Sequence, residues 1–414
     1  MSEKEIGVYV DIPGDTCPVR VGTLWACQAH RRESAKFAYA STWLNSPCGY
    51  ALEPALPMVA GIQYTAHALF GCMEDSSPDR WGRTLINRAE TLRAREEGRP
   101  RSHFTEADYM LGVSDETRQG ALRFSVDGGN TFMNSDAGNV VPPLINLPKL
   151  LHAADMTCEE KAGWDDLHLL LAPGSSLGGA WPKSCVRDTD GRLCIAKFSR
   201  QDQDRDVVAW EAVLLGLAKR AGLEVPPFRL LAIPAGRKQR HVLLVQKFDR
   251  DAANARIPYL SAMSLLDATD GEQRSYMELA EAMVQHCARP ERCLPELWRR
   301  MVFSLMVSNT DDHMRNHGFV RRRGGWQLSP LFDVNPTPPD VAPRILATPL
   351  TPGMEEVDKA PLLELAPYFG IRGDAARQEW ASLAAAVAGW RAEASRYHIP
   401  PAEQERMAGA FSPL

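Results

Sequence analysis

The chain lacks any cysteine or histidine cluster with the spacing of a metal site. Its nine cysteines are scattered, odd in number and include no Cys-x-x-Cys pair. This distribution argues against a disulfide framework and against a structural zinc. The net charge of −5 supplies no global basic field, so wholesale non-specific nucleic-acid binding is not expected. Basic clusters at 93–101 and 321–325 can be local patches or solvated loops.

Long hydrophobic runs are also missing. No apolar stretch approaches the roughly 18 residues that a membrane span requires. The N-terminal MSEKEIGVYVDIPG passes directly from acidic residues into a strand pattern, which is not the pattern of a signal peptide. We therefore expect a soluble, reduced, cytoplasmic protein with no membrane association. Its 414 residues, 44% hydrophobic and 24% charged, suffice for two or three cores.

The first part of the chain begins with strand patterns and continues with helical ones. Asp79 is placed to cap a helix that stops at Gly98. A stretch rich in Gly, Asn, Asp and Pro at 126–145 predicts a linker or domain boundary. The elements expected before it are strands within 5–30, at 37–44 and at 120–129, and helices at 79–98 and 105–113.

After the boundary, the pattern is a helix, a hairpin and a second helix. Thr157 and Glu160 predict a capping box for an amphipathic helix at 158–174. The Asp190-Gly191 pair favours a tight turn between the strands WPKSCV and RLCIAKF. A helix is then expected at 207–222, followed by the strands FRLLAI and HVLLVQKFDR, and the chain after residue 275 is mostly helical.

A glycine-rich segment, PGSSLGGAWPKS at 173–184, precedes the first strand of the hairpin. Paired glycines let a backbone approach a ligand closely and direct N–H groups at an anion. The lysine lies in strand context with no helix after it, so the segment is not a P-loop. A plain glycine turn would explain the same residues.

Lys197 lies among apolar residues at the end of the strand LCIAKF. A buried ammonium requires an anionic partner, because desolvating an isolated charge is costly. Glu211 in the following helix, or the phosphates of a ligand, could be that partner. The alternative is a strand edge on which Lys197 faces solvent.

The stretch SNTDDHMRN at 308–316 has the spacing of a kinase catalytic loop. In such a loop an Asp accepts the hydroxyl proton and an Asn five residues later holds magnesium, which here are Asp311 and Asn316. Asp333, after a short hairpin, is positioned as a second oxygen ligand. A solvated acidic turn would explain the loop alone. The glycine turn, Lys197, the helix glutamate and Asp333 occur in the order that a bilobal kinase requires.

Two more residues of this loop are candidates. His313 could hydrogen-bond to Asp311 or to the backbone and stiffen the loop, or be purely structural. Arg315 could neutralise transferred phosphate charge or remain solvated. Asp312 is expected to point away from the reaction.

Taken together, these segments resemble the HipA family, the serine/threonine kinase toxins of bacterial toxin–antitoxin modules. The resemblance rests on SLGGAWPK, LCIAKF, VQKFDRD, NTDDHMRNHGF and LSPLFDVNP, and upstream on SPDRWGRTLINR and DYMLGVSDETRQGALRF. It implies an α+β, bilobal, protein-kinase-like fold with a β-rich N-lobe, an extra N-terminal subdomain and a helical C-lobe. The implied division is an N-terminal subdomain at 1–145, a kinase N-lobe at 146–250 and a C-lobe at 251–414.

The resemblance also implies roles for individual residues. Asp311 would be the catalytic base, with His313 and Arg315 beside it, and Asn316 and Asp333 would hold Mg²⁺. Ser176, or Ser175 beside it, would be the autophosphorylation site. Trp181 departs from the polar or basic residue usual in the family. The residues implied around ATP are Ser176, Leu177, Gly178, Gly179, Ala180, Lys183, Lys197, Gln246 and Phe248.

The function implied is an ATP- and Mg²⁺-dependent serine/threonine protein kinase acting as a toxin. Its substrate would be a protein of the translation machinery, such as an aminoacyl-tRNA synthetase. A HipB-like helix-turn-helix antitoxin would hold it and would make most of the contact with operator DNA. Two alternatives are a small-molecule kinase of the aminoglycoside- or choline-kinase kind and a catalytically idle co-repressor.

Overall fold

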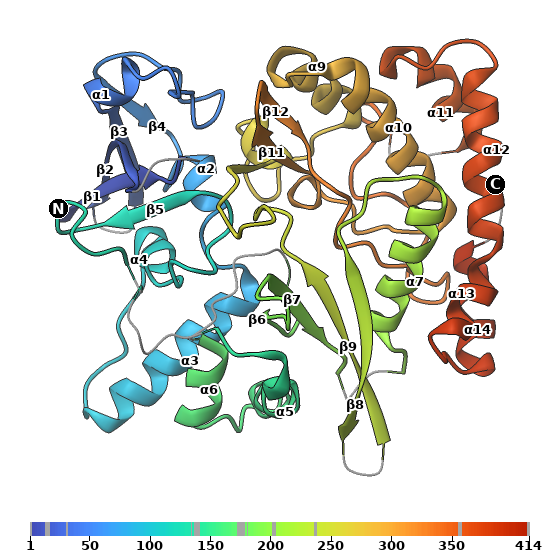
Figure 1. The fold of residues 1–414 in the computed structure, drawn as a ribbon, viewed down its shortest axis with the longest axis horizontal. Coiled ribbons are helices and arrows are strands. Elements are labelled where there is room, and N and C mark those ends of the chain that lie inside the picture. Colours follow the sequence, from blue (N-terminus) through green and yellow to red (C-terminus); the bar gives the residue numbers. More distant parts are fainter. Residues whose placement is uncertain are drawn as a thin grey trace. The chain divides into compact units, whose positions relative to one another are not determined.

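The computed structural model describes residues 2–12, 17–29, 32–133, 135, 141–171, 179, 181–200, 204–235, 238–354 and 358–411. The chain forms two compact units, each built from two segments (Figure 1). Unit 1 comprises 1–198 and 249–260, and unit 2 comprises 199–248 and 261–414. Their boundaries differ from the three segments expected from the sequence, and that three-part division stays a prediction.

Unit 1 opens with a five-stranded antiparallel sheet in the order β4-β3-β2-β1-β5 (Figure 1). One face carries its core, because Ile6, Leu24 and Phe37 are fully buried and lie opposite one another in the register. This alternation confirms the strand predictions for the N-terminal part. The strands are β1 (Ser2–Val10), β2 (Val19–Ala29), β3 (Arg32–Tyr39), β4 (Ile62–Thr65) and β5 (Leu122–Ser125).

The expected strand at 37–44 is only half right. β3 ends at Tyr39, and Ser41–Leu44 forms the short helix α1, in which Trp43 is fully buried. The Trp43 indole donates to the carbonyl of Tyr50 at 3.1 Å, a contact that the strand pattern did not anticipate.

Two helices of this part begin directly after a capping residue, and the start predicted at Asp79 is confirmed. Asp79 accepts a hydrogen bond from the Gly82 N–H at 2.7 Å and starts α3 (Arg80–Glu96). A complete capping box between Thr105 and Asp108 starts α4 (Glu106–Leu111). The short helix α2 (Gly71–Glu74) precedes them.

The capping box expected at Thr157 is wrong. Thr157 lies inside α5 (Leu147–Cys158), fully buried, with its hydroxyl bonded to the Ala153 carbonyl at 2.8 Å. The helix expected from residue 158 begins only at α6 (Trp164–Leu171). α5 was missed because prolines surround its start, and Pro at the first turn of a helix is compatible with helix formation.

The predicted hairpin is confirmed as β6 (Lys183–Arg187) and β7 (Leu193–Phe198). Gly191 takes a φ of +83° in its turn, a conformation that suits glycine. The strand interiors are buried, and Cys185, Leu193 and Ile195 form a small core with Val141.

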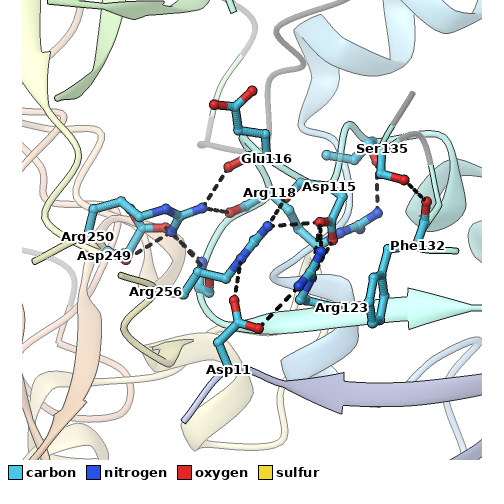
Figure 2. A network of polar contacts seen from close by, with 12 residues as sticks. Asp11, Asp115, Glu116, Arg118, Arg123, Phe132, Ser135, Asp249, Arg250 and Arg256 are labelled. Atoms are coloured by element: carbon cyan, nitrogen blue, oxygen red, sulfur yellow. Dashed lines mark hydrogen bonds and ion pairs between the residues drawn. The ribbon is translucent and has the colours of Figure 1, made fainter. Parts of the chain in front are cut away.

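A buried polar network ties 249–256 to the loop before β5 (Figure 2). Asp249 accepts from the Gly120 N–H at 2.8 Å, and the Arg250 guanidinium donates to the carbonyls of Glu116 and Arg118 at 3.0 and 2.9 Å. Arg256 pairs with Asp115 at 3.1 Å and with Asp11 at 3.1 Å. These contacts explain why 249–260 belongs to unit 1.

The described part of unit 2 contains two hairpins and the helices that follow residue 206. Its first helix, α7, ends before a glycine as expected, because Gly222 follows the helix with a φ of +75°. The hairpins are β8 (Phe228–Ala235) with β9 (Lys238–Gln246), and β11 (Gly318–Arg322) with β12 (Gly325–Leu328). The short strand β10 (Tyr259–Ser261) crosses the sequence boundary between the two units, which follows residue 260. The helices are α7 (Val207–Arg220), α8 (Ala262–Leu265), α9 (Tyr276–His286), α10 (Pro290–Met306), α11 (Lys359–Leu365), α12 (Ala375–Ala388), α13 (Trp390–Arg396) and α14 (Pro401–Met407).

The centre of unit 2 is α10, whose residues Leu297–Met306 are nearly all buried. α12 and α13 are separated at Gly389. The mixture of antiparallel hairpins and packed helices confirms the α+β class. None of the helices in the described part of the chain is long and apolar enough to cross a membrane.

Candidate active site

The stretch 308–317 leaves the buried end of α10 and is fixed by contacts with two later segments. The Ser308 carbonyl accepts from the Thr337 N–H at 2.8 Å, and the Asn309 side chain accepts from the Asn335 N–H at 3.0 Å. The Thr310 carbonyl accepts from the Ala347 N–H at 2.9 Å. The start of the loop is therefore held beside the segment that contains Asp333.

Asp311 lies on the outside of this loop. Its side chain is 82% exposed, and the nearest ring nitrogen of His313 is 3.9 Å from Oδ1. Its backbone carbonyl accepts from the Asn316 amide nitrogen at 2.7 Å, which closes the loop between the two residues. The fixed backbone and exposed carboxylate suit a group that must reach a substrate hydroxyl.

Asp312 has the opposite environment. It is 1% exposed and accepts hydrogen bonds from the Tyr276 hydroxyl and, at 3.3 Å, from the Thr348 N–H. The Thr348 hydroxyl donates to its backbone carbonyl at 2.8 Å. Burial raises the pKa of Asp312 to about 7. The side chain is thus an internal anchor of the loop, a role that the sequence left unassigned.

The same anchor includes His317. Its Nε2 lies 3.2 Å from the Asp312 carbonyl and 3.3 Å from the Tyr276 hydroxyl. Burial lowers the pKa of His317 to about 4, so the ring is neutral at physiological pH. A neutral ring avoids placing an additional buried charge beside Asp312.

The geometry of the Asn316 side-chain amide suits a metal ligand. Its amide nitrogen is committed to the Asp311 carbonyl, which directs Oδ1 the other way. That oxygen is buried and accepts no hydrogen bond from any described residue, an uncommon state for a buried polar atom. An amide oxygen of this kind fits Mg²⁺, which prefers hard oxygen ligands.

Asp333 has a φ of +55°, which is rare outside glycine and carries strain. It is partly exposed and lies two residues before Asn335, which contacts the loop through Asn309. The described residues include no group of three or more His, Cys, Asp or Glu side chains that could hold a metal. A site of one Asp and one Asn would rely on substrate phosphates for its remaining ligands, as Mg²⁺ sites often do.

Gln246 is the last residue of β9, and Phe248 lies two residues beyond it. The Phe248 ring packs against the Phe332 ring, with centroids 5.2 Å apart. Phe332 directly precedes Asp333 in the chain. The Gln246 N–H donates to the Pro227 carbonyl at 2.9 Å. Unit 2 thus brings Phe248 to the predicted metal-binding segment.

Arg315 contacts an acidic side chain from a distant part of the chain. Its Nε donates to Asp270 at 2.9 Å, and the two side chains are 31% and 78% exposed. His313 is partly exposed, and its Nδ1 is buried with no hydrogen-bond partner among described residues. Catalytic roles for both residues stay predictions.

The residues predicted around ATP in unit 1 are only partly described. Ser175, Ser176, Leu177, Gly178 and Ala180 lie outside the described residues. Lys197 is 9% exposed at the end of β7, and Glu211 in α7 is 3% exposed in unit 2. Gly179 takes a φ of +99°, which only glycine adopts easily.

Lys183 is buried and forms an ion pair, and its expected role near phosphates stays a prediction. It is 2% exposed, and its ammonium lies 2.5 Å from the Asp79 carboxylate at the start of α3. Local sequence patterns did not predict this contact, because the two residues belong to segments far apart in the chain.

The family model of the HipA-like C-terminal domain matches residues 175–392, more than half of the chain. The chain belongs to the HipA-like family. The match includes most of the glycine-rich segment, Lys197, the loop at 308–316 and Asp333, and it confirms the resemblance indicated by these motifs.

A solved HipA-like structure extends this likeness to the whole fold. The complex of the Shewanella oneidensis HipA, HipB and operator DNA contains a chain that is similar with a TM-score of 0.67 over 98% of this chain and 95% of that one. At 17% identity the similarity shows the fold, and it confirms the HipA-type architecture. The Helicobacter pylori proinflammatory kinase CtkA, 13% identical over 55% of this chain and 92% of its own, has a TM-score of 0.37, too low to bear on the fold.

Among curated proteins, a putative kinase of Haemophilus influenzae is 26% identical over 154 residues. The alignment covers 34% of this chain, and the chain spans 45% of the length of that relative.

Proposed function

We propose that this HipA-like protein is an ATP- and Mg²⁺-dependent kinase that phosphorylates serine or threonine of a protein. The observation that carries the proposal is that Asp311 and Asn316, in one loop, present two different groups. Asp311 is exposed on a fixed backbone, while Asn316, bonded to the Asp311 carbonyl, leaves an amide oxygen without a described partner.

In this proposal Asp311 accepts the proton of the attacking hydroxyl. The hydrogen bond from Asn316 to its carbonyl, and the buried anchor of Asp312, fix the direction in which the carboxylate projects. Oδ1 of Asn316 and the carboxylate of Asp333 would hold Mg²⁺. When bound, the metal supplies positive charge that offsets charge on the phosphates. Lys197 would contact the phosphates, and Gln246 and Phe248 would lie beside the nucleotide.

The regulatory part of the proposal follows from the family. The solved Shewanella oneidensis complex joins HipA to HipB and operator DNA, and we propose a HipB-like antitoxin with its operator for this chain too. Autophosphorylation at Ser176, or at Ser175, would inactivate the kinase. A component of the translation machinery, such as an aminoacyl-tRNA synthetase, would be the substrate, and the cytoplasm the location.

Phosphoproteomics of cells expressing the chain tests the proposal. Wild-type protein should produce new phosphoserine or phosphothreonine sites, whereas Asp311→Asn should produce none. Asp374→Asn is a matched control, because that side chain is also 82% exposed and lies elsewhere in unit 2. Equal phosphorylation by wild type and Asp311→Asn would contradict the proposal. Phosphorylation of a small molecule alone would support the small-molecule kinase, and no ATP turnover would support the idle co-repressor.

A further inference from the structure

Two buried lysines lie directly opposite each other in the hairpin of unit 1. The antiparallel register pairs Lys183 of β6 with Lys197 of β7, and the side chains are 2% and 9% exposed. Directly opposed residues project from the same face of a sheet, with Cβ atoms about 4.5–5.5 Å apart. Like charges in that arrangement are unfavourable, and burial strengthens their repulsion. The pair therefore needs a compensating negative charge.

Asp79 supplies negative charge to one of the two lysines. Its Oδ2 lies 2.5 Å from the Lys183 ammonium, and the two side chains are 4% and 2% exposed. Its other oxygen, Oδ1, caps α3 through the Gly82 N–H at 2.7 Å. One carboxylate thus starts a helix and neutralises a buried lysine of a strand that lies far along the chain.

The start of α3 also fixes the backbone on both sides of residue 181. The Trp81 indole donates to the Lys183 carbonyl at 2.9 Å, and the Trp81 N–H donates to the Gly179 carbonyl at 3.3 Å. The Trp181 indole in turn donates to the Phe198 carbonyl at 2.8 Å, next to Lys197. Trp181, unusual for the family, thus joins the two ends of the hairpin.

We propose that Asp79 neutralises Lys183, so that Lys197 is the one of these two lysines whose charge acts on an anionic ligand. Lys183 is then a positioning residue of β6, and Asp79 sets the local charge. This inference rests on the proposed function, because the anion is taken to be the phosphates of a nucleotide. It also gives α3, a helix from the first part of the chain, a role in nucleotide binding.

The test is a charge series in the full-length protein, with MgADP as the probe and calorimetry as the measurement. Asp79→Asn removes the negative charge and keeps the cap, since Asn is as good an N-cap as Asp. It should tighten MgADP binding at least about threefold, because it adds net positive charge beside Lys197. Lys183→Met should weaken binding at least about threefold, because it leaves the Asp79 charge there.

The double variant Asp79→Asn/Lys183→Met decides between the explanations. Removing both charges should return the MgADP affinity to within about twofold of the wild-type value, since positions 79 and 183 together again carry no net charge beside Lys197. Lys197→Met should lose at least about tenfold, as expected for a direct phosphate ligand. If a single variant does not fold, the double variant and Lys197→Met still permit the comparison. Binding is measured well below the lowest melting temperature of the set.

Three results would overturn the inference. A double variant as weak as Lys197→Met would show that Lys183 is itself a phosphate ligand. Unchanged affinity in both single variants, with lowered melting temperatures, would show that the Asp79–Lys183 pair is only structural. No binding of MgADP by the wild-type protein would contradict the proposed function, and the inference with it. The first two results leave the proposed function standing.

Discussion

Asp311 and Asp312 are adjacent in the chain, yet their carboxylates have opposite environments. The Asp311 side chain is 82% exposed, whereas Asp312 is 1% exposed and accepts a hydrogen bond from Tyr276. An exposed carboxylate can be reached by a substrate, whereas a buried one holds the structure through its hydrogen bonds. The proposed mechanism depends on this difference. Five predictions test the role of each residue and the packing of the rest of the fold.

Tyr276→Phe should lower the free energy of unfolding by about 1–3 kcal/mol, because it leaves the buried Asp312 carboxyl without one of its donors. Urea denaturation of the full-length protein, monitored by fluorescence, measures this loss of unfolding free energy. Tyr368→Phe is the control, since that side chain is 66% exposed and the change should have almost no effect. Equal stability of the two variants would mean that the Asp312 anchor contributes little.

The stability of the protein should carry a pH dependence from Asp312. Its pKa is about 7 in the folded protein against an ordinary value of 3.8, so between these values the folded state retains a proton that the unfolded state loses. The contribution is therefore full below about pH 4 and is lost as pH rises through about 7, by at most about 1.4 kcal/mol per pH unit.

Asp312→Asn should abolish this dependence, because asparagine resembles the protonated carboxyl and does not titrate. The measurement is the difference in free energy of unfolding between wild type and Asp312→Asn from pH 4 to pH 8. This difference should shift in favour of Asp312→Asn as the pH rises. A constant difference across the range would contradict the assignment.

Asn316→Ala should raise the Mg²⁺ concentration needed for half-maximal phosphate transfer by at least about tenfold, because an amide ligand oxygen is lost. The measurement is a Mg²⁺ titration at fixed ATP. Asn45→Ala is a control, because Asn45 is an exposed residue of unit 1. An unchanged Mg²⁺ requirement in Asn316→Ala would remove Asn316 from the metal site.

Arg118→Met should destabilise unit 1 by about 3 kcal/mol or more, since three carbonyls lose their donor together. The buried Arg118 guanidinium donates to the carbonyls of Ser76, Met110 and Val113 at 3.0, 2.7 and 2.9 Å. Burial lowers the pKa of Arg118 to about 9. Arg118→Lys should recover little, because one ammonium cannot match a planar fork. Arg101→Met, at an exposed position, is the control; a similar effect of both would contradict the prediction.

The sequence predicted what short-range patterns determine. Asp79 was predicted to cap the helix directly after it, and the structure confirms this. The helix expected at 105–113 is found at Glu106–Leu111. The spacing of Asp311 and Asn316 is likewise local, and the structure joins them by a hydrogen bond at 2.7 Å.

Contacts between distant segments could not be predicted in this way. Tyr276 and Thr348, the partners of Asp312, each lie 36 residues from it in the chain. The pairing of Asp79 with Lys183 depends on how α3 packs against β6, which no local pattern encodes. α5 was missed for a local reason, since its prolines resembled the preceding linker.

The rate of ADP formation with purified protein and a serine- or threonine-containing substrate tests the central claim most directly. Asp311→Asn should be slower than wild type by at least about 100-fold, the usual contribution of a general base, with an unchanged melting temperature. Asp374→Asn should retain the wild-type rate. A rate for Asp311→Asn within about threefold of wild type would contradict the assignment of Asp311 as the base, because a general base contributes far more than that.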